Sequence, residues 1–425
     1  MKRESRTVDR SYQGDSPRQR HLPLVDLLVD TRAELMELAV ASGLKVLHTM
    51  LEDDRTAICG PHYQHQAART ASRAGTVPSD VILGGRKVQI RRPRVRANGK
   101  ELALPTFVAF ADEDPLNRRV VEQMLVGVAT RRYARSLEPV GPAVVTRGTS
   151  KSAVSRRFVV NTAAQLEAWR TTRLDDLDLV ALLIDSVHVA DHCIIVALGI
   201  DATGRKHALG LWEGATENAT VCQSLLANLQ SRGLRTDRSL LVILDGSKAL
   251  HRAVTQVFDR AALIQRCQVH KRRNVLDHLP ERQRPWVRTI LNRAYTSADV
   301  TTARRLLVDL ARRLEDQHPS AAESVREGLD ETLTVLTLGI SDRLRHSLAT
   351  TNAIESLMSR IRHVKRNVKR WRGGTMVVRW VAAGVLEAIK GFRRLQGKAD
   401  MPKLVAALRT RDQKLGIGDA VAHVA

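Results

Sequence analysis

Cysteine is scarce in this chain of 425 residues, and the four that it has, Cys59, Cys193, Cys222 and Cys267, form no Cys-x-x-Cys pair. This spacing argues against a disulfide framework and against a four-cysteine zinc site, and it fits a reducing cytoplasm. A run of about 18 apolar residues, as a membrane-spanning helix requires, is also missing. Residues 1–22 are charged and polar without the apolar stretch of an export signal. We therefore expect a cytoplasmic protein.

Positive charge, by contrast, is abundant. The chain carries 68 Lys and Arg against 45 Asp and Glu, for a formal charge of +23. Such an excess attracts polyanions, and nucleic acid above all. Because 43% of the residues are hydrophobic over this length, we expect globular domains and not a basic tail on a scaffold. A soluble basic enzyme without a nucleic-acid partner is the alternative.

The stretch from Leu240 to His270 predicts a strand, a helix and a second strand. Five apolar residues, Leu240 to Leu244, run into Asp245 and Gly246, which is typical of a buried strand with an acid at its carboxyl end. Helical spacing follows in residues 247–258, and residues 261–264 form another short apolar run. Ligands of open α/β sheets bind beyond the carboxyl ends of the strands, so Asp245 is a candidate site residue.

A second apolar run ends in an acid at Asp185. Residues 193–200 and 207–212 follow it as predicted strands and complete a three-stranded meander, and Thr216 or Asn218 caps the next predicted helix. Three strands, helix, strand, helix, strand is the order of a ribonuclease-H-like fold. After it, helical spacing without strands predicts an all-helical insertion, which makes the fold class α/β with an interrupted core.

A third acid, Glu355, stands in the sequence that follows the predicted insertion. Two acids at one sheet edge repel unless cations lie between them, and two-metal sites hold Mg²⁺ ions about 3.5–4 Å apart. We expect Asp185, Asp245 and Glu355 to be the catalytic metal ligands for two Mg²⁺, with Mn²⁺ as a substitute. Asn352 as a helix N-cap with Glu355 three residues later also fits a capping box, and the two roles are compatible.

These blocks resemble those of Mutator-type insertion-sequence transposases, a DDE family. The similarity lies in LLIDSVHV around Asp185, LVILDGSKAL around Asp245 and ATTNAIESLMSRIR around Glu355, and it extends to GATEN and VKRWRGG. It implies Mg²⁺-dependent cleavage at terminal inverted repeats and joining to target DNA. It also matches Cys267 and His270 to a C-x2-H signature, where a packed thiol with a hydrogen-bonded imidazole and a direct chemical role both stay open.

The predicted domain organisation combines the patterns with this resemblance. A mainly helical N-terminal DNA-binding region precedes the core, and its first part is expected to hold two helices divided near Gly43 and a basic edge strand containing Pro93. The expected divisions are residues 1–75 (helical, with a loose arm), 76–112 (β-rich), 113–178 (helical, helix-turn-helix-like), 179–275 (first part of the core), 276–345 (helical insertion), 346–396 (second part of the core) and 397–425 (tail).

Basic residues near the predicted helices are candidate DNA contacts. Ser150 caps a predicted short basic helix suited to base recognition, although such helices are common. The basic run after Glu355 fits a track for phosphates better than a solvated face. Trp371 and Trp380 flank that run and are expected either in the core or stacked on an unpaired base. The candidate DNA-binding residues are Lys151, Arg156, Arg157, Arg360, Arg362, Lys365, Arg366, Lys369, Arg370 and Arg372.

The expected partners are therefore double-stranded DNA, as terminal repeats and as target, and a second copy of the chain, because two element ends must be paired. Two alternatives stay open. A ribonuclease-H-like nuclease uses the same metal site without strand transfer. A DNA-binding regulator derived from a transposase has no need of the three acids, and all three are present.

Overall fold

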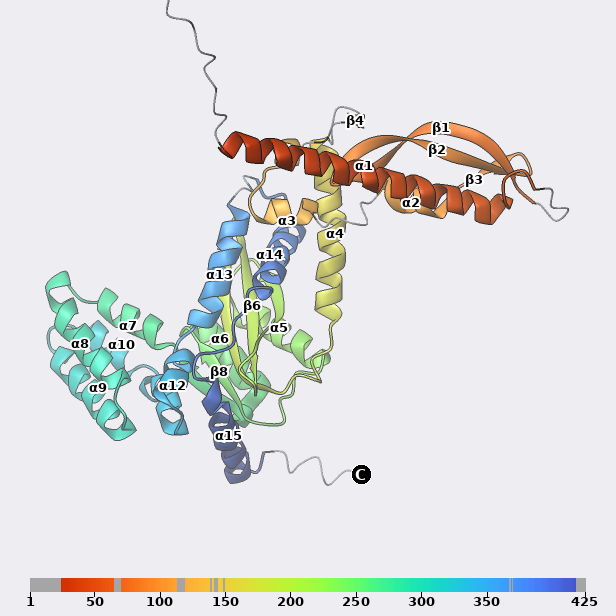
Figure 1. Cartoon of the computed structure of the whole chain (residues 1–425). Helices are drawn as coiled ribbons and strands as arrows, with labels where there is room; N and C mark the ends of the chain where they lie inside the picture. The colour runs from red at the N-terminus through yellow and green to blue at the C-terminus, as the bar shows by residue number, and fades with distance from the viewer. Residues whose placement is uncertain are drawn as a thin grey trace, which may run out of the picture. The chain divides into compact units, whose positions relative to one another are not determined.

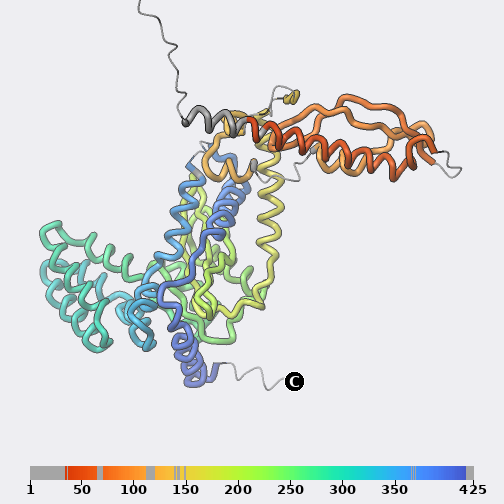
Figure 2. Tube along the Cα trace, viewed as in Figure 1, coloured from red at the N-terminus to blue at the C-terminus, as the bar shows by residue number. Residues whose placement is uncertain are grey.

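The computed structural model divides into two compact units. One comprises residues 1–117 and 134–149, and the other comprises residues 118–133 and 150–425. Fifteen α-helices and two sheets occur in the part of the chain that is described. Figure 2 traces that part in colour. The described residues are 24–64, 70–112, 119–137, 140, 144–147, 150–366, 368 and 370–417, with the side chains of 24–33, 36, 112, 119 and 365 excepted.

The first unit packs two helices against a sheet. Gly84 and Gly85 form the two-residue hairpin turn between its first two strands, and both have the positive φ, 60° and 80°, that such a turn requires. Leu47, Leu51, Val81 and other buried apolar residues form its core. The elements are α1 (Leu24–Cys59), β1 (Ser72–Leu83), β2 (Arg86–Ala97), β3 (Lys100–Leu102), α2 (Pro105–Asp112) and β4 (Thr146–Arg147).

Two predictions for this unit are wrong. α1 is one helix of 36 residues that continues through Gly43; a helix-interior glycine costs only about 1 kcal/mol, which a long helix tolerates. β2 is not an edge strand, because β1 pairs along one side of it and β3 and β4 pair on the other. Pro93 fits there because β4 pairs with residues 87–88 and β3 with residues 95–97, which leaves that side of Pro93 without a partner strand.

The second unit is built on a five-stranded sheet of order β7-β6-β5-β8-β9. β5, β6 and β7 are antiparallel neighbours, as the predicted meander requires, while β8 and β9 continue the sheet parallel to β5. The carboxyl ends of β5, β8 and β9 therefore point to one edge. The bounds are β5 (Leu179–Val189), β6 (His192–Asp201), β7 (Lys206–Gly214), β8 (Leu240–Leu244) and β9 (Ala262–Arg266).

Helices cover both faces of this sheet (Figure 1). α5 (Ala219–Ser231) and α6 (Lys248–Phe258) bury their apolar residues with Leu182 and Val242 on one face. Helices from both flanks of the chain pack with Leu183 and Ile243 on the other. This second group consists of α4 (Lys151–Thr171), α13 (Asn352–Lys365) and α14 (Gly374–Ile389). Of these, α13 returns from far along the chain beside β5 and α14 beside β7, while α4 packs against α14 (Figures 1 and 2).

The segment between β9 and α13 is helical throughout its described elements, as predicted. It leaves the sheet directly after Cys267 and returns at Thr351. Its α-helices are α7 (Gln268–Asp277), α8 (Arg284–Tyr295), α9 (Val300–Glu315), α10 (Pro319–Arg326), α11 (Leu329–Thr332) and α12 (Asp342–Leu348). Two short 3-10 helices also lie in this segment, η3 (Glu281–Gln283) and η4 (Thr334–Leu338). Those outside it are η1 (Tyr133–Ser136), η2 (Asp259–Ala261) and η5 (Lys398–Asp400).

Two helices of this unit differ from the prediction. α4 begins at the predicted cap, where Ser150 accepts a hydrogen bond from the N–H of Ala153, but it runs for 21 residues and is not a short helix. Before it lies α3 (Arg119–Leu125). The expected tail contains α15 (Met401–Leu415), which buries Met401, Leu404 and Leu408 in the core.

Candidate active site

Asp185 and Asp245 lie at the same level of neighbouring parallel strands. Leu183 of β5 is in register with Ile243 of β8, and each aspartate stands two residues further on. β8 ends at Leu244, so Asp245 begins the loop, whereas β5 continues past Asp185 because β6 still pairs with it up to Val189. The backbone N–H of Ser186 donates to Asp185 and that of Ser247 to Asp245, at 2.8 and 2.9 Å. Both acids thus stand at the predicted edge of the sheet.

Glu355 reaches this edge from the first turn of α13. The helix buries Ile354, Leu357 and Met358 against the sheet, and Glu355 lies half-buried beside them. The predicted capping box is wrong by one residue, since the N-cap is Thr351 and not Asn352. The hydroxyl of Thr351 donates to Oε1 of Glu355 at 2.8 Å, and the N–H of Glu355 donates back to the carbonyl of Thr351.

The three carboxylates interact electrostatically. Burial raises the pKa of Asp185 to about 6, and the charges of Asp245 and Glu355 push it in the same direction. The N–H of Ser186 and the charge of His270 oppose that rise. Three acids gathered at one sheet edge, where the environment disfavours the ionised form of Asp185, make a set of hard oxygen donors, which suits Mg²⁺.

Cys267 and His270 form a second cluster with Glu355. One ligand atom from each of the three lies within 4.8 Å of the others, and no other group of three or more such residues among the described ones is as close. Nε2 of His270 is 3.9 Å from Oε1 of Glu355. Thr351 links them, because its N–H and its hydroxyl both lie 3.3 Å from Sγ of Cys267. Cys267 is fully buried, and a hydrogen bond joins its thiol to the imidazole of His270.

The thiol and the imidazole shift each other's titration. The hydrogen bond with Cys267, its charge and the nearby acids raise the pKa of His270 to about 9, against the effect of burial. Burial also acts to raise the pKa of Cys267, but hydrogen bonds from His270 and Thr351 outweigh it and leave the pKa below its ordinary value. Cys267 is moreover the N-cap of α7, where the helix dipole favours a thiolate. The pair therefore places a positive imidazole beside the carboxylates.

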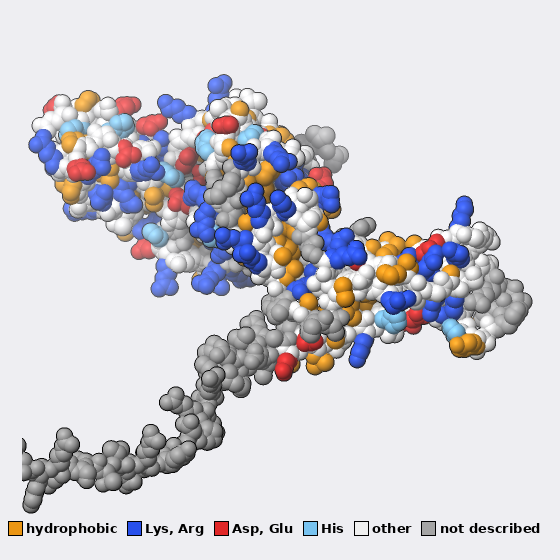
Figure 3. Space-filling view, turned by 90° about the horizontal axis from the view of Figure 1, so that it is seen from above, with side chains coloured by type: hydrophobic (Ala, Val, Ile, Leu, Met, Phe, Trp, Pro, Cys, Tyr) orange, Lys and Arg blue, Asp and Glu red, His pale blue; other side chains and the backbone are white. Residues whose placement is uncertain are grey.

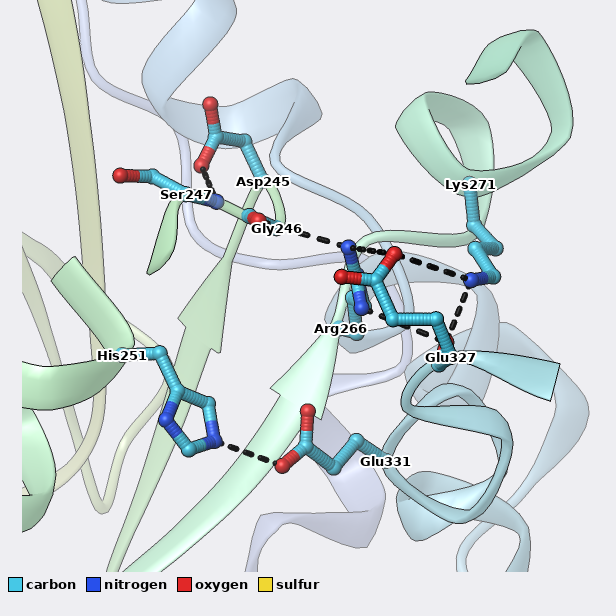
Figure 4. Close-up of polar contacts among 8 residues, drawn as sticks. All are labelled: Asp245, Gly246, Ser247, His251, Arg266, Lys271, Glu327 and Glu331. Carbon is cyan, nitrogen blue, oxygen red and sulfur yellow. Dashed lines mark hydrogen bonds and ion pairs between the residues drawn. The ribbon is translucent and has the colours of Figure 1, made fainter. Parts of the chain in front are cut away.

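Arg266 connects this edge to the helical segment (Figure 4). It is 7% exposed, and its Nη2 donates to the carbonyl of Gly246, next to Asp245, at 3.4 Å. The same nitrogen is 3.1 Å from the carboxylate of Glu327, and Nη1 donates to the backbone carbonyl of Glu327 at 3.3 Å. Lys271, 2% exposed, donates to that carbonyl as well. Two buried cations thus hold the returning chain at Glu327 against the loop that carries Asp245.

Glycines flank the guanidinium of Arg266 on both sides. A Cβ on Gly246 would lie 2.7 Å from its Nε, and a Cβ on Gly328 would lie 2.8 Å from its Nη1. Both glycines have positive φ, 109° and 60°. The fit therefore depends on the absence of side chains there. Below them, His251 pairs with Glu331 at 2.7 Å (Figure 4).

The predicted basic contacts are mostly exposed. Lys151 and Arg156 are exposed on α4, while Arg157 is half-buried. Figure 3 shows Lys and Arg side chains crowded over much of the body that is visible from above, with few acids among them. Lys369 and the side chain of Lys365 lie outside the described residues. The exposed basic residues of α13 and the segment after it are Arg360, Arg362, Arg366, Arg370 and Arg372.

Comparison with known proteins identifies the family of this chain. The model of the family described as "Transposase, Mutator family" matches residues 29–394, which is most of the chain. The chain belongs to the Mutator family of transposases. The expected family resemblance is thereby confirmed, together with its link to insertion sequences and transposition.

Several curated relatives of this Mutator-family chain are insertion-sequence transposases. The transposase of IS406 from Burkholderia multivorans is 26% identical over 84% of this chain and 90% of its own length. That of ISRM5 from Rhizobium meliloti is 25% identical over 89% and 94%. That of IST2 from Acidithiobacillus ferrooxidans is 30% identical, but over 40% of this chain and 56% of its own length.

Some residues at the site were not predicted from the sequence. Thr351 stands in the quoted ATTN stretch but carried no expectation, and Arg266 directly precedes Cys267 without having been singled out. Glu217 was noticed only as part of a helix start, yet its carboxylate accepts a hydrogen bond from the hydroxyl of Ser186, next to Asp185. A charged residue at the end of an apolar run, as at Arg266, is a signal that the sequence offers.

Among the described helices, none has both the length and the apolar composition needed to cross a bilayer.

Proposed function

We propose that this chain is the transposase of an insertion sequence, which binds the element's terminal inverted repeats and catalyses Mg²⁺-dependent DNA cleavage and strand transfer. The observation that carries the proposal is that Asp185, Asp245 and Glu355 meet at one sheet edge, where burial raises the pKa of Asp185 to about 6 and repulsion from the other two acids adds to that rise. Binding of cations removes that repulsion. Membership of a transposase family supports DNA as the substrate.

We further propose that the second unit contains a ribonuclease-H-like core. The strand order β7-β6-β5-β8-β9, with the first three strands antiparallel and the last two parallel to β5, supports this assignment. The helical segment between β9 and α13 then corresponds to an insertion at residues 276–345. The insertion separates Glu355 from the two aspartates in sequence, and α13 returns it to them.

Asp185, Asp245 and Glu355 would hold the metal ions, whose chemistry is to activate the attacking oxygen and to stabilise the leaving oxygen. Thr351 keeps the carboxylate of Glu355 in place through its hydroxyl, and the two backbone N–H groups do the same for the aspartates. His270 adds a positive charge near Glu355. The exposed arginines of α13 would bind the phosphates of the DNA strand that enters the site.

The test is a cleavage assay on DNA that carries the element's ends. Asp185→Ala, Asp245→Ala and Glu355→Ala are each expected to abolish Mg²⁺-dependent cleavage while binding to the ends persists. Near wild-type cleavage by Glu355→Ala would remove that residue from the metal site and leave it only the structural contact with Thr351. Supplying pre-cleaved ends and a target plasmid separates a transposase from a nuclease, because only the transposase joins them. Light scattering of the protein on paired ends should detect at least a dimer.

A further inference from the structure

The second unit contains a cavity of about 880 Å³ that lies apart from the carboxylates. Its walls come from α4, α14, the end of α3 with the residues after it, and the segment that joins α13 to α14. These three helices contact one another (Figure 1). The cavity is therefore a feature of the fold of this unit.

Aromatic rings form part of the lining. Phe158 and Trp380 are buried and in contact, with ring centroids 4.4 Å apart and planes tilted by 37°. Trp380 thus belongs to the core, as one of the two predictions for it stated. Trp371 also borders the cavity but is only half-buried, so its indole keeps surface on which a planar group can stack.

The polar part of the lining is cationic. Arg370, Arg372 and Arg379 all line the cavity, and no Asp or Glu among the described residues does. In the part of the chain that is described, none of these three arginines forms an ion pair. The Nε of Arg379 is buried and has no acceptor among the described residues. A half-buried guanidinium without a partner is unfavourable, which favours an anion in the cavity beside Arg379.

From these observations we infer that the cavity binds an unpaired nucleotide of a DNA strand, with the base stacked on Trp371 and an adjacent phosphate bound by Arg379 and its neighbours. This inference rests on the proposed function, since it assumes a DNA substrate. Stacking surfaces combined with arginines are how proteins bind single-stranded nucleic acid without reading its sequence. A phosphate alone has no use for the indole, and an apolar ligand has no use for three unpaired guanidinium groups.

The position of the cavity fits a strand that also passes the carboxylates. Arg366 ends α13 eleven residues after Glu355, which corresponds to about 16 Å along the helix. A few nucleotides of an extended strand span that distance. The exposed side chains of Arg362 and Arg366 lie along the way. Cleaving a duplex end would thus be accompanied by unpairing of a base close to the cut.

The first experiment separates base from phosphate. Binding of the full-length protein is measured, in EDTA, to oligothymidylate of ten nucleotides and to an abasic strand of equal length. We expect Trp371→Ala to weaken binding of oligothymidylate about 5- to 100-fold and to leave the abasic strand unaffected, because stacking is lost only where a base exists. Arg379→Met should weaken both and lower the salt slope by about 0.7. Arg409 has an exposed side chain on α15, and Arg409→Met removes the same charge away from the cavity. This variant is the matched control.

Equal losses on both strands for Trp371→Ala would overturn the inference and make Trp371 a packing residue. If that variant fails to fold by thermal unfolding, Trp371→Phe takes its place; it keeps a smaller stacking surface and should show an intermediate loss. No loss on oligothymidylate with either variant would equally reject the site.

The second experiment locates the base directly. Oligothymidylate that carries one 5-iodouracil is irradiated with the wild-type protein, and the adduct is mapped by mass spectrometry. We expect crosslinking at Trp371 in the wild type and none at that position in Trp371→Ala, which offers no ring to the base. Adducts that fall only outside the cavity would overturn the inference. Because no metal is present, this outcome is independent of cleavage: a wild-type protein that cleaves with Mg²⁺ but forms no adduct at Trp371 rejects the cavity alone, whereas cleavage that survives the carboxylate variants rejects the proposed function alone.

Discussion

Thr351 holds Glu355 by a hydrogen bond of 2.8 Å from its hydroxyl to Oε1, in the turn where the helical segment gives way to α13. Thr351 is fully buried, and its N–H lies 3.3 Å from the sulfur of Cys267 at the opposite end of the same segment. The two ends of an excursion of more than eighty residues are thus joined beside the third carboxylate. Four predictions follow from this and related contacts.

Removing the hydroxyl of Thr351 should slow cleavage without opening a cavity in the core. Thr351→Val keeps the shape of the side chain but leaves Oε1 of Glu355 without its donor. We expect cleavage to fall about 10-fold, in line with the loss of groups that orient metal ligands, and the Mg²⁺ concentration for half-maximal rate to rise. Thr351→Ser should restore most of the rate. A Thr351→Val enzyme with unchanged Mg²⁺ dependence would show that the hydroxyl serves packing only.

Asp185 should destabilise the metal-free protein at neutral pH. Its pKa is about 6 in the folded state against 3.8 for the ordinary group, so the unfolded state releases its proton first and stability falls as pH rises from about 4 to 6. Asp185→Asn removes this effect. In EDTA we expect it to raise the free energy of unfolding at pH 7 by about 1–3 kcal/mol and to have little effect at pH 4.

Magnesium provides the control for that measurement. Adding Mg²⁺ at pH 7 should stabilise the wild type more than Asp185→Asn, because the ion binds the ionised carboxylate. If the variant is less stable than the wild type in EDTA at pH 7, burial and the neighbouring acids do not disfavour the charge of Asp185 in the folded protein.

A methyl group at Gly328 should disturb the packing of the Arg266 guanidinium between Gly246 and Gly328. Gly328→Ala brings a Cβ to 2.8 Å from Nη1 of Arg266, whereas Gly339→Ala meets nothing within 4 Å. The two glycines have nearly equal φ, 60° and 63°, so the backbone strain of the two variants matches. We expect Gly328→Ala to lose about 1–3 kcal/mol more stability than Gly339→Ala.

We also expect Gly328→Ala to cleave DNA ends more slowly than Gly339→Ala. The guanidinium that Gly328→Ala displaces donates to the carbonyl of Gly246, adjacent to Asp245. Urea unfolding and end cleavage of the two variants give the comparison. Equal stability in the two variants would mean that Arg266 moves aside without cost.

Affinity for DNA should divide between two basic surfaces. Neutralising Arg362 and Arg366 on α13 should weaken binding to any DNA and reduce the salt slope by about two, because phosphate contacts carry no sequence information. Lys151→Ala and Arg156→Ala, in the first turns of α4, should chiefly reduce the preference for the terminal repeat over random DNA. Titrations of both DNAs at several salt concentrations measure this. If Arg156→Ala weakens both equally, α4 does not read bases.

Local pattern was enough to predict the elements that carry the aspartates. Asp245 follows five apolar residues that can only be buried, and the strand ends where the acid and Gly246 begin. The meander of β5 to β7 was also predicted from local pattern, because its strands are apolar runs separated by turns. Prediction failed where a local rule met a larger structure: Gly43 does not interrupt α1, and α15 forms because the core offers its apolar residues a surface.

The N-terminus of α13 shows how close sequence analysis came to the site. Glu355 was identified correctly as standing in a first turn, but the cap was placed on Asn352. Thr351 takes that position because its buried side chain contacts Cys267 and His270, which come from the other end of the helical segment. No pattern within residues 348–360 contains that information.

By itself, the sequence determined the strands of the five-stranded sheet and their order along the chain, the three acids that meet at its edge, and the resemblance to the family, because burial of short apolar runs and the residue types of a motif are local properties. Only the tertiary structure decided that Arg266 is held between Gly246 and Gly328, that Thr351 links Cys267 to Glu355, and that Trp371 borders a cavity lined with arginines. Each of these depends on residues far apart in the chain that meet once the core has packed. Such meetings follow from the geometry of the whole fold and leave no periodic trace in the sequence.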